Sequence, residues 1–227
     1  MPGANTLRIL LCGQQGTGKT GWARQAVRRA LRAGRRVVIL STKPADYREL
    51  VGVQRTFLVR EPAAGYSVSR LEGIIRQAQG TFFVFERFTN KTSRPAFAGL
   101  VAQAVERVGN ILLVIDEAHQ YLPRYGTEPH SIGLLTAARA RRVDVILITQ
   151  HPKLLDDVAI KESNAWVLFA LPDPNESRYL AELSGVPQER IQRLQVGEYV
   201  MHYAGTFFDP ERPTSRLDLA KEYGATA

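Results

Sequence analysis

Residues 7–20 read LRILLCGQQGTGKT, an apolar run that passes directly into three glycines, a lysine and a threonine. The apolar run predicts a buried strand, and the glycines predict a tight turn, because glycine adopts backbone angles that other residues avoid. Residues 21–33 then predict an amphipathic helix that ends near Gly34. Its apolar stripe consists of Ala23, Ala26, Val27, Ala30 and Leu31.

Residues 13–20 match the phosphate-binding pattern G-x-x-x-x-G-K-[ST] in the strand–turn–helix context that the pattern requires. In such a loop, backbone N–H groups and the start of the helix bind phosphates, and we expect Lys19 to reach the β- and γ-phosphates of ATP. The Thr20 hydroxyl is then a ligand for Mg²⁺. A glycine turn that serves close packing alone is the alternative. The predicted cofactor-binding residues are Gly13, Gln14, Gln15, Gly16, Thr17, Gly18, Lys19 and Thr20.

The rest of the chain alternates between strand-like and helix-like patterns, which predicts an α/β fold with a mainly parallel sheet flanked by helices. The predicted strands cover residues 7–12, 36–40, 81–86, 111–115, 143–149 and 165–170. Further helices are predicted near residues 68–79, 95–108, 132–140 and 175–183.

A last strand is predicted in GEYVMHYAG, residues 197–205, at an edge of the sheet. No internal repeat and no second core pattern interrupts the chain, so we expect a single ATPase domain over residues 1–208. Residues 209–227, with two prolines, are expected to form a loosely ordered tail or to clasp a neighbouring subunit.

The composition excludes several classes of protein. The single cysteine, Cys12, allows neither an intrachain disulfide nor a cysteine-cluster metal site. No apolar run reaches the roughly 18 residues of a membrane helix, and residues 1–6 do not resemble a signal peptide, so we expect a cytoplasmic protein without a transmembrane segment. The net charge of +8 favours a polyanionic partner such as nucleic acid, although an arginine-rich composition alone could also produce it.

A pair of carboxylates follows the predicted strand in ILLVIDEAHQYLP, residues 111–123. Ligands bind at the carboxyl ends of strands in open α/β sheets. We therefore expect Asp116 to organise Mg²⁺ and Glu117 to polarise a water molecule against the γ-phosphate. The alternative is that both residues only cap the helix that follows.

The strand in VDVILITQHP, residues 143–152, ends in Thr149 and Gln150. Gln150 is predicted to sense the γ-phosphate and to position the attacking water, or else to hydrogen-bond a turn before Pro152. His119 and His151 are interpreted as local hydrogen-bonding residues, because no second ligand follows either at metal-site spacing.

Together, GQQGTGKT, LLVIDEAHQYLP and RARRVDVILITQHPKLLDD resemble the FtsK–HerA superfamily of DNA-pumping ATPases over roughly residues 7–203. In size, the chain is most similar to the genome-packaging ATPases of tailless, membrane-containing icosahedral viruses. The resemblance implies a RecA-like sheet and a homo-oligomeric ring, commonly of six subunits, around double-stranded DNA. It also implies that ATP lies between subunits and that an arginine from one subunit contacts the γ-phosphate bound to the next.

The candidates for this arginine are Arg139, Arg141 and Arg142, just before residues 143–149, although a solvated basic helix end is the alternative. DNA is expected to meet the loops at residues 86–95 and 121–129, which would contact phosphates without reading bases. Plain solvated loops are the alternative. The DNA-contact candidates are Arg87, Lys91, Arg94 and Arg124.

The function expected from the resemblance is a DNA translocase that packages viral DNA into a preformed capsid in the host cytoplasm. Such a motor would bind ATP and Mg²⁺ and dock on a capsid-vertex or portal protein. A cellular DNA-pumping ATPase of conjugation or repair, a small-molecule P-loop kinase and a non-enzymatic assembly protein remain as alternatives. A kinase would need neither Glu117 nor a ring, and its arginine-rich lid is not found in the sequence.

Overall fold

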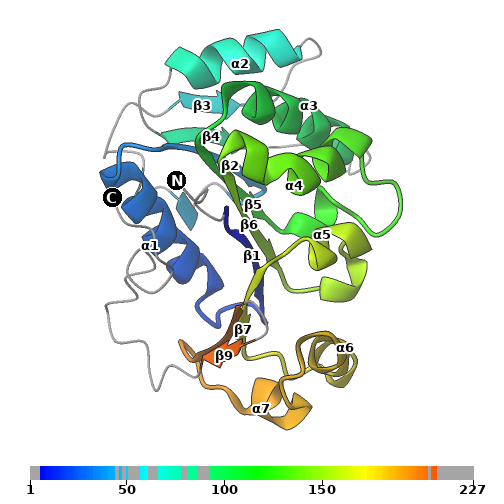
Figure 1. The fold of residues 1–227 in the computed structure, drawn as a ribbon. Helices are drawn as coiled ribbons and strands as arrows, with labels where there is room; N and C mark the ends of the chain where they lie inside the picture. The colour runs from blue at the N-terminus through cyan, green and yellow to red at the C-terminus, as the bar shows by residue number, and fades with distance from the viewer. Residues whose placement is uncertain are drawn as a thin grey trace.

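The computed structural model describes residues 6–43, 46–47, 50, 57–60, 66–77, 81–85, 93–203 and 206–208. Within these residues the strands form one nine-stranded sheet in the order β3-β4-β2-β5-β6-β1-β7-β8-β9 (Figure 1). The pairs from β3 to β7 are parallel, whereas β8 pairs antiparallel with β7, and β9 antiparallel with β8. The strands are β1 (Arg8–Cys12), β2 (Arg36–Ser41), β3 (Phe57–Arg60), β4 (Thr81–Phe85), β5 (Ile111–Asp116), β6 (Val143–Thr149), β7 (Ala165–Phe169), β8 (Tyr199–Tyr203) and β9 (Thr206–Phe208).

Helices cover both faces of the sheet. On one face lies α1, and on the other lie α2, α3, α4 and α5, with α6 and α7 beside β7 (Figure 1). The helices are α1 (Lys19–Arg32), α2 (Val68–Gln77), α3 (Ser93–Val108), α4 (Pro129–Arg141), α5 (Asp157–Lys161), α6 (Pro174–Ser184) and α7 (Gln188–Arg193), with the 3₁₀ turns η2 (Ala118–Gln120) and η3 (Pro152–Leu154).

Alternation along the central strands divides the core into two layers. In β1, Ile9 and Leu11 pack with α1, whereas Leu10 and Cys12 pack on the opposite face with α3 and α4. Because both faces are covered, the central strands read as continuous apolar runs, and every residue of β5 is buried.

The predicted α/β class, the mainly parallel sheet and the added strand near the C-terminus are confirmed. The sequence analysis missed the short elements β3, β9, α5 and α7, which have too few residues for a clear period. The predicted C-terminal edge strand corresponds to β8, with β9 paired on its outer side. The predicted tail at residues 209–227 lies outside the described residues.

The strand order determines where the carboxyl ends meet. The strand β6 lies between β1 and β5, so the turn after β1, the end of β6 and the end of β5 are consecutive along one edge. We call this side the carboxyl edge and the opposite side, where these strands begin, the amino edge. Among the described residues, no helix is both long and apolar enough to cross a membrane.

Candidate nucleotide-binding site

The loop after β1 is bound to the segment that follows β7 and is also braced by a hydrogen bond within the loop. The Gln14 N–H donates to the carbonyl of Ala170 at 2.8 Å, and the Thr17 hydroxyl donates to the carbonyl of Gln14 at 2.7 Å. A side chain at Gly13 would bring its Cβ within 2.6 Å of the Cβ of Phe169, so only glycine fits there. The loop is therefore held in shape without a ligand.

The helix α1 begins at Lys19, directly after Gly18 in the left-handed region at φ 113°. The first turn of α1 contains no acidic residue, so the positive end of the helix dipole faces the loop uncompensated. The Lys19 ammonium donates to the carbonyls of Gly13 and Gln14, both at 2.6 Å. Burial lowers the pKa of Lys19, and the carboxylate of Glu117 partly opposes that effect.

The two carboxylates lie at the end of β5. The carboxylate of Asp116 is buried and accepts hydrogen bonds from the Glu117 N–H at 3.0 Å and the Ser41 hydroxyl at 3.3 Å. Burial and the neighbouring charge of Glu117 raise the pKa of Asp116 to about 6. Glu117 adopts the left-handed conformation (φ 53°, ψ 49°), which is strained for a residue with a branched or long side chain.

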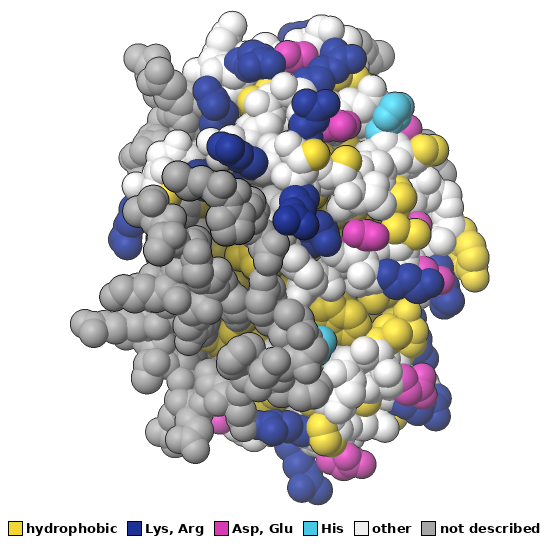
Figure 2. Space-filling model, in the orientation of Figure 1, with side chains coloured by type: hydrophobic (Ala, Val, Ile, Leu, Met, Phe, Trp, Pro, Cys, Tyr) yellow, Lys and Arg dark blue, Asp and Glu magenta, His cyan; other side chains and the backbone are white. Residues whose placement is uncertain are grey.

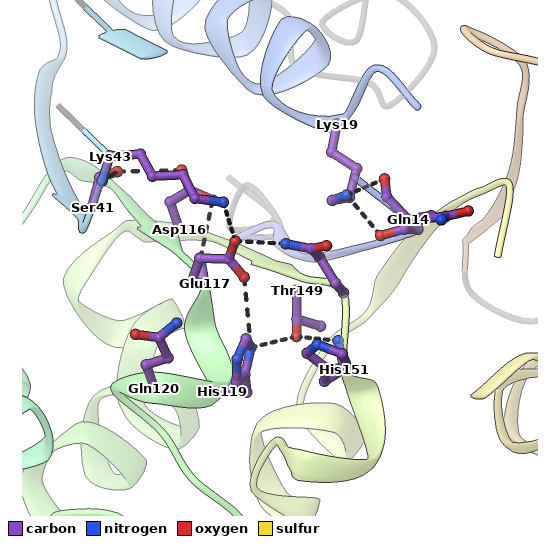
Figure 3. A network of polar contacts seen from close by, with 12 residues as sticks. Gln14, Lys19, Ser41, Lys43, Asp116, Glu117, His119, Gln120, Thr149 and His151 are labelled. Atoms are coloured by element: carbon purple, nitrogen blue, oxygen red, sulfur yellow. Dashed lines mark hydrogen bonds and ion pairs between the residues drawn. The ribbon is translucent and has the colours of Figure 1, made fainter. Parts of the chain in front are cut away.

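The Glu117 side chain is 7% exposed and is held by two donors (Figure 3). Its Oε1 accepts from the Lys43 ammonium at 2.5 Å and from the Gln150 amide at 2.7 Å. Burial raises the pKa of Glu117, but the hydrogen bond and charge of Lys43 outweigh burial, so the pKa is lowered and the carboxylate is ionised.

Next to Glu117, the two histidines form a small network with Thr149. The Thr149 hydroxyl accepts from the His151 N–H at 3.0 Å and lies 3.0 Å from His119 Nδ1, and the imidazole rings stack edge-to-face at 5.2 Å. Burial lowers the pKa of His119 to about 4, so the ring is neutral. Among the described residues, no group of three or more histidine, cysteine or acidic side chains is placed to hold a metal ion.

These groups surround one pocket of about 440 Å³. The pocket connects the phosphate loop and the start of α1 to the ends of β5 and β6, so it brings Lys19, Asp116, Glu117 and Gln150 together. Its lining consists of Gln15, Gly16, Gly18, Lys19, Thr20, Gly21, Arg24, Lys43, Asp46, Asp116, Glu117, Ile148 and Gln150.

The donors in this pocket suit Mg²⁺ bound together with a phosphate chain. Mg²⁺ in nucleotide sites takes few protein oxygens and completes its shell with water and phosphate. The Thr20 hydroxyl and the Asp116 carboxylate are such oxygens, and both line the pocket.

The three candidate finger arginines lie on the other side of the sheet. They are exposed at the end of α4, where the chain enters β6, and Arg141 lies 3.9 Å from the carboxylate of Glu106. The pocket lies at the opposite end of β6, beyond Thr149. The arginines Arg139, Arg141 and Arg142 are therefore too far from the pocket of their own subunit to contact its nucleotide.

The DNA-contact candidates are only partly within the described residues, because Arg87 and Lys91 lie outside them. The Arg94 guanidinium donates to the side-chain oxygen of Gln120, close behind the carboxylates. The side chain of Arg124 is 41% exposed and pairs with Asp157 at 3.6 Å, with its guanidinium 5.9 Å from the ring centroid of Tyr125.

The sequence analysis missed the contribution of the segment after β2. Ser41 and Lys43 contact Asp116 and Glu117, and Asp46 lines the pocket. The sequence contained a signal for this segment: STKP (residues 41–44) begins at the last residue of a buried strand, just as TQHP (residues 149–152) begins at the last residue of β6. The position of β2 beside β5 was not known from the sequence, so the two segments could not be connected.

Comparisons with known proteins agree with this fold. The model of a family described as AAA domain matches residues 5–156. No curated protein matches the sequence significantly.

Several solved structures share the fold. The genome packaging NTPase B204 from Sulfolobus turreted icosahedral virus 2 in complex with AMP matches with a TM-score of 0.69 at 16% identity over 90% of this chain and 96% of that chain. The bacterial conjugative coupling protein TrwBdeltaN70 matches with a TM-score of 0.68 at 12% identity, over 88% and 83% of the two chains. VirB4 of Thermoanaerobacter pseudethanolicus matches with a TM-score of 0.65 at 11% identity, over 89% and 88%.

The resemblance that the motifs indicated is thus confirmed in the three-dimensional structure. The chain belongs to the AAA domain family and shares its fold with a viral genome packaging NTPase, a bacterial conjugative coupling protein and VirB4.

Proposed function

We propose that this P-loop NTPase is an ATP-hydrolysing motor that moves double-stranded DNA, and that its task is to package a viral genome into a preformed capsid. The observation that carries the ATPase part is the position of Glu117. Its carboxylate lines the same pocket as the phosphate loop and accepts a hydrogen bond from Gln150, at the end of the strand between them. A kinase does not need such a glutamate, because its substrate supplies the attacking group.

The proposed reaction is transfer of the γ-phosphoryl group of ATP to water. The loop N–H groups and Lys19 hold the phosphate chain, and Glu117 accepts a hydrogen bond from the attacking water while Gln150 orients it. The bond from the water oxygen to the γ-phosphorus forms as the bond to the β–γ bridging oxygen breaks, and the water proton passes to solvent by way of Glu117. Mg²⁺, held by Thr20 and Asp116, would neutralise the charge on the phosphates.

The location of the three arginines, far from the pocket of their own subunit, supports a ring. Because Arg139, Arg141 and Arg142 are exposed at the amino edge, away from their own pocket, a finger among them requires a neighbouring subunit. We therefore propose that the chain acts as a homo-oligomer, with six subunits as the expected number, and that each pocket is completed by the next subunit.

DNA as the partner is supported by charge and by the relatives. The chain carries a net charge of +8, and Lys and Arg side chains gather over the α2–α3 end and again near α6 and α7 on the face seen in Figure 2. Such charge binds phosphates without reading the sequence, as a motor for any DNA requires. The B204 structure is described as a genome packaging NTPase and covers nearly the whole chain, which favours packaging in the host cytoplasm at a capsid vertex or portal.

A cellular DNA-pumping role is the second candidate. TrwBdeltaN70, a bacterial conjugative coupling protein, matches with almost the same TM-score as B204. The two candidates share the motor chemistry and differ in the protein that docks the ring.

The deciding experiment measures ATP hydrolysis with and without linear duplex DNA of random sequence. We expect DNA to stimulate hydrolysis by wild type, whereas Lys19→Ala should lose ATP binding and hydrolysis under both conditions. If the protein phosphorylates nucleosides or small metabolites and does not hydrolyse ATP, the motor proposal is rejected in favour of a kinase. If the protein hydrolyses ATP but neither binds duplex DNA nor is stimulated by it, the ATPase assignment stands and the translocase proposal is rejected.

A further inference from the structure

The hydroxyl of Tyr47 is buried without a hydrogen-bond partner. Tyr47 lies six residues beyond the end of β2, its side chain is fully buried, and no group in the described part of the chain is hydrogen-bonded to its Oη. A buried hydroxyl left in this way lowers the free energy of unfolding. Such groups are rare in folded proteins, so the surroundings of this hydroxyl should identify the partner that it serves.

The ring of Tyr47 belongs to the core between α1 and the sheet. It is part of the same apolar layer as Leu11 of β1, Ala23 and Val27 of α1, and Ile39 of β2. Protein cores are closely packed, so a large ring in such a layer has little freedom to swing. The hydroxyl at the end of the ring therefore keeps a defined position, and the groups next to it are constant neighbours.

The neighbours of this hydroxyl are side chains of the nucleotide pocket. The hydroxyl lies next to the carboxylate of Asp116 without forming a hydrogen bond with it. Burial and the charge of Asp116 raise the pKa of Tyr47 well above its usual value, so the hydroxyl keeps its proton and can donate. Asp46 and Arg24 also act on Tyr47 electrostatically, and both line the pocket together with Asp116. Tyr47 thus offers an unused donor to a carboxylate of the pocket.

The carboxylate of Asp116 has the capacity for this donor. An ionised carboxylate can accept about four hydrogen bonds. Within the described residues, Asp116 accepts two, from the Glu117 N–H at 3.0 Å on one oxygen and from the Ser41 hydroxyl at 3.3 Å on the other (Figure 3). The second bond is long, so one oxygen of the candidate Mg²⁺ ligand is only weakly held.

A carboxylate that binds a metal ion depends on the hydrogen-bond donors around it, because these donors fix its orientation. We propose that Tyr47 is a positioning residue for Mg²⁺, whose hydroxyl donates to Asp116 and fixes the orientation of that carboxylate toward the ion. This inference rests on the proposed ATPase function, in which Asp116 holds Mg²⁺. The hydroxyl then contributes to metal binding, although its burial lowers the stability of the fold.

The test is Tyr47→Phe in the full chain, which removes one oxygen atom and keeps the ring. ATPγS binding is measured in EDTA and over a series of Mg²⁺ concentrations. The gain in affinity from Mg²⁺ should fall by about tenfold in Tyr47→Phe, whereas the affinity in EDTA should change by less than about twofold. The melting temperature without ligands should stay equal or rise, because the unpaired hydroxyl is gone. The matched control, Tyr66→Phe, removes a hydroxyl from a half-buried ring packed on Phe97 and should leave the gain unchanged.

A double-mutant cycle tests whether Tyr47 acts through Asp116. Asp116→Asn should itself reduce the gain from Mg²⁺, and Tyr47→Phe should then have no further effect on it. Retained ATPγS binding in EDTA shows that each variant is folded. An unchanged gain in Tyr47→Phe, an equal loss of affinity with and without Mg²⁺, or full additivity with Asp116→Asn would overturn the role of Tyr47 and leave the ATPase intact. Failure of wild type to bind ATPγS under either condition would instead reject the proposed function.

Discussion

At the amino edge of the sheet, Asp144 accepts a hydrogen bond from the Leu7 N–H at 2.7 Å and pairs with Arg35, whose guanidinium also donates to the carbonyl of Ile111 at 3.1 Å. At the carboxyl edge, Glu117 is held by Lys43 and Gln150, and all three line an open pocket. The two edges thus use the same kinds of side chain. In the amino-edge cluster, the side chains of Asp144 and Arg35 also hydrogen-bond to backbone groups of neighbouring segments. At the carboxyl edge, Glu117, Lys43 and Gln150 hydrogen-bond to one another through their side chains.

This difference separates a structural network from a reactive one. The partners of Asp144 and Arg35 lie away from the pocket, so a ligand in the pocket does not compete for them and the cluster contributes to stability in every state. Side-chain partners such as Lys43 can exchange, because a phosphate offers a competing acceptor. A charged cluster that faces a pocket and contacts mainly other side chains is therefore the better indicator of function in this fold.

The largest expected effect comes from the amino edge, although that edge is otherwise structural, because we propose that one of its arginines is catalytic. Replacement of Arg139, Arg141 and Arg142 by alanine, one at a time, should identify one arginine whose loss lowers ATP turnover by about 10³–10⁵, the range for an arginine finger. ATP affinity and thermal stability should remain close to wild type, because each side chain is exposed and distant from its own pocket. Steady-state hydrolysis and ATPγS binding measure the two quantities.

Mixing variants tests the trans arrangement directly. Subunits with the critical arginine replaced keep an intact phosphate loop, and Lys19→Ala subunits keep an intact arginine. Turnover should therefore reappear when these two inactive proteins are mixed. Some mixed interfaces then combine the intact phosphate loop of the arginine variant with the intact arginine of the Lys19→Ala variant. No recovery in mixed oligomers would place the finger elsewhere.

The next largest effect is at the carboxyl edge. Glu117→Gln should lower kcat by about 10²–10⁴, as expected when a general base is lost, while ATP binding is retained or tightened. The substitution keeps the shape and the contact with Gln150 but removes the charge that polarises water. Single-turnover hydrolysis separates this chemical step from binding, and wild-type turnover by the variant would remove Glu117 from the mechanism.

The sequence predicted the fold class and the loop because both depend on local patterns. Residues 13–20 and the buried run before them are contiguous, and so are Asp116 and Glu117 at the end of β5. Glu117 and Gln150 were each expected after a buried strand, with roles toward the attacking water, but the contact between the two was not predicted. Their roles in catalysis remain predictions that the variants above test.

The contribution of Lys43 could not be predicted in the same way. It depends on β2 lying directly beside β5, with Leu40 opposite Ile115, and nothing local in the sequence encodes that pairing. The opposite location of Arg139 relative to the pocket follows from the parallel direction of β6 and β1, which the sequence patterns did predict. Strand order is thus the information that the sequence patterns lacked.

A smaller effect is expected from the structural network. Asp144→Ala should lower the free energy of unfolding by about 2–3 kcal/mol, because it removes the partner of Arg35 and the acceptor for the Leu7 N–H. Asp144→Asn keeps one acceptor and should cost less. ATPγS affinity should not change in either variant. Urea unfolding together with binding measures both, and a large loss of affinity would show that the amino edge is coupled to the pocket.

The smallest expected effect concerns DNA binding by Arg124, whose side chain is 41% exposed. Arg124 forms an exposed ion pair with Asp157 and lies over the ring of Tyr125, and because the exposed pair contributes little to stability, a DNA phosphate can replace Asp157 as its partner. Arg124→Gln should reduce the slope of log affinity against log salt by about 0.9, one phosphate contact on duplex DNA. Asp157→Asn should strengthen binding, whereas Arg32→Gln, an exposed control at the end of α1, should change neither quantity. An unchanged slope in Arg124→Gln would exclude the loop after η2 from the DNA path.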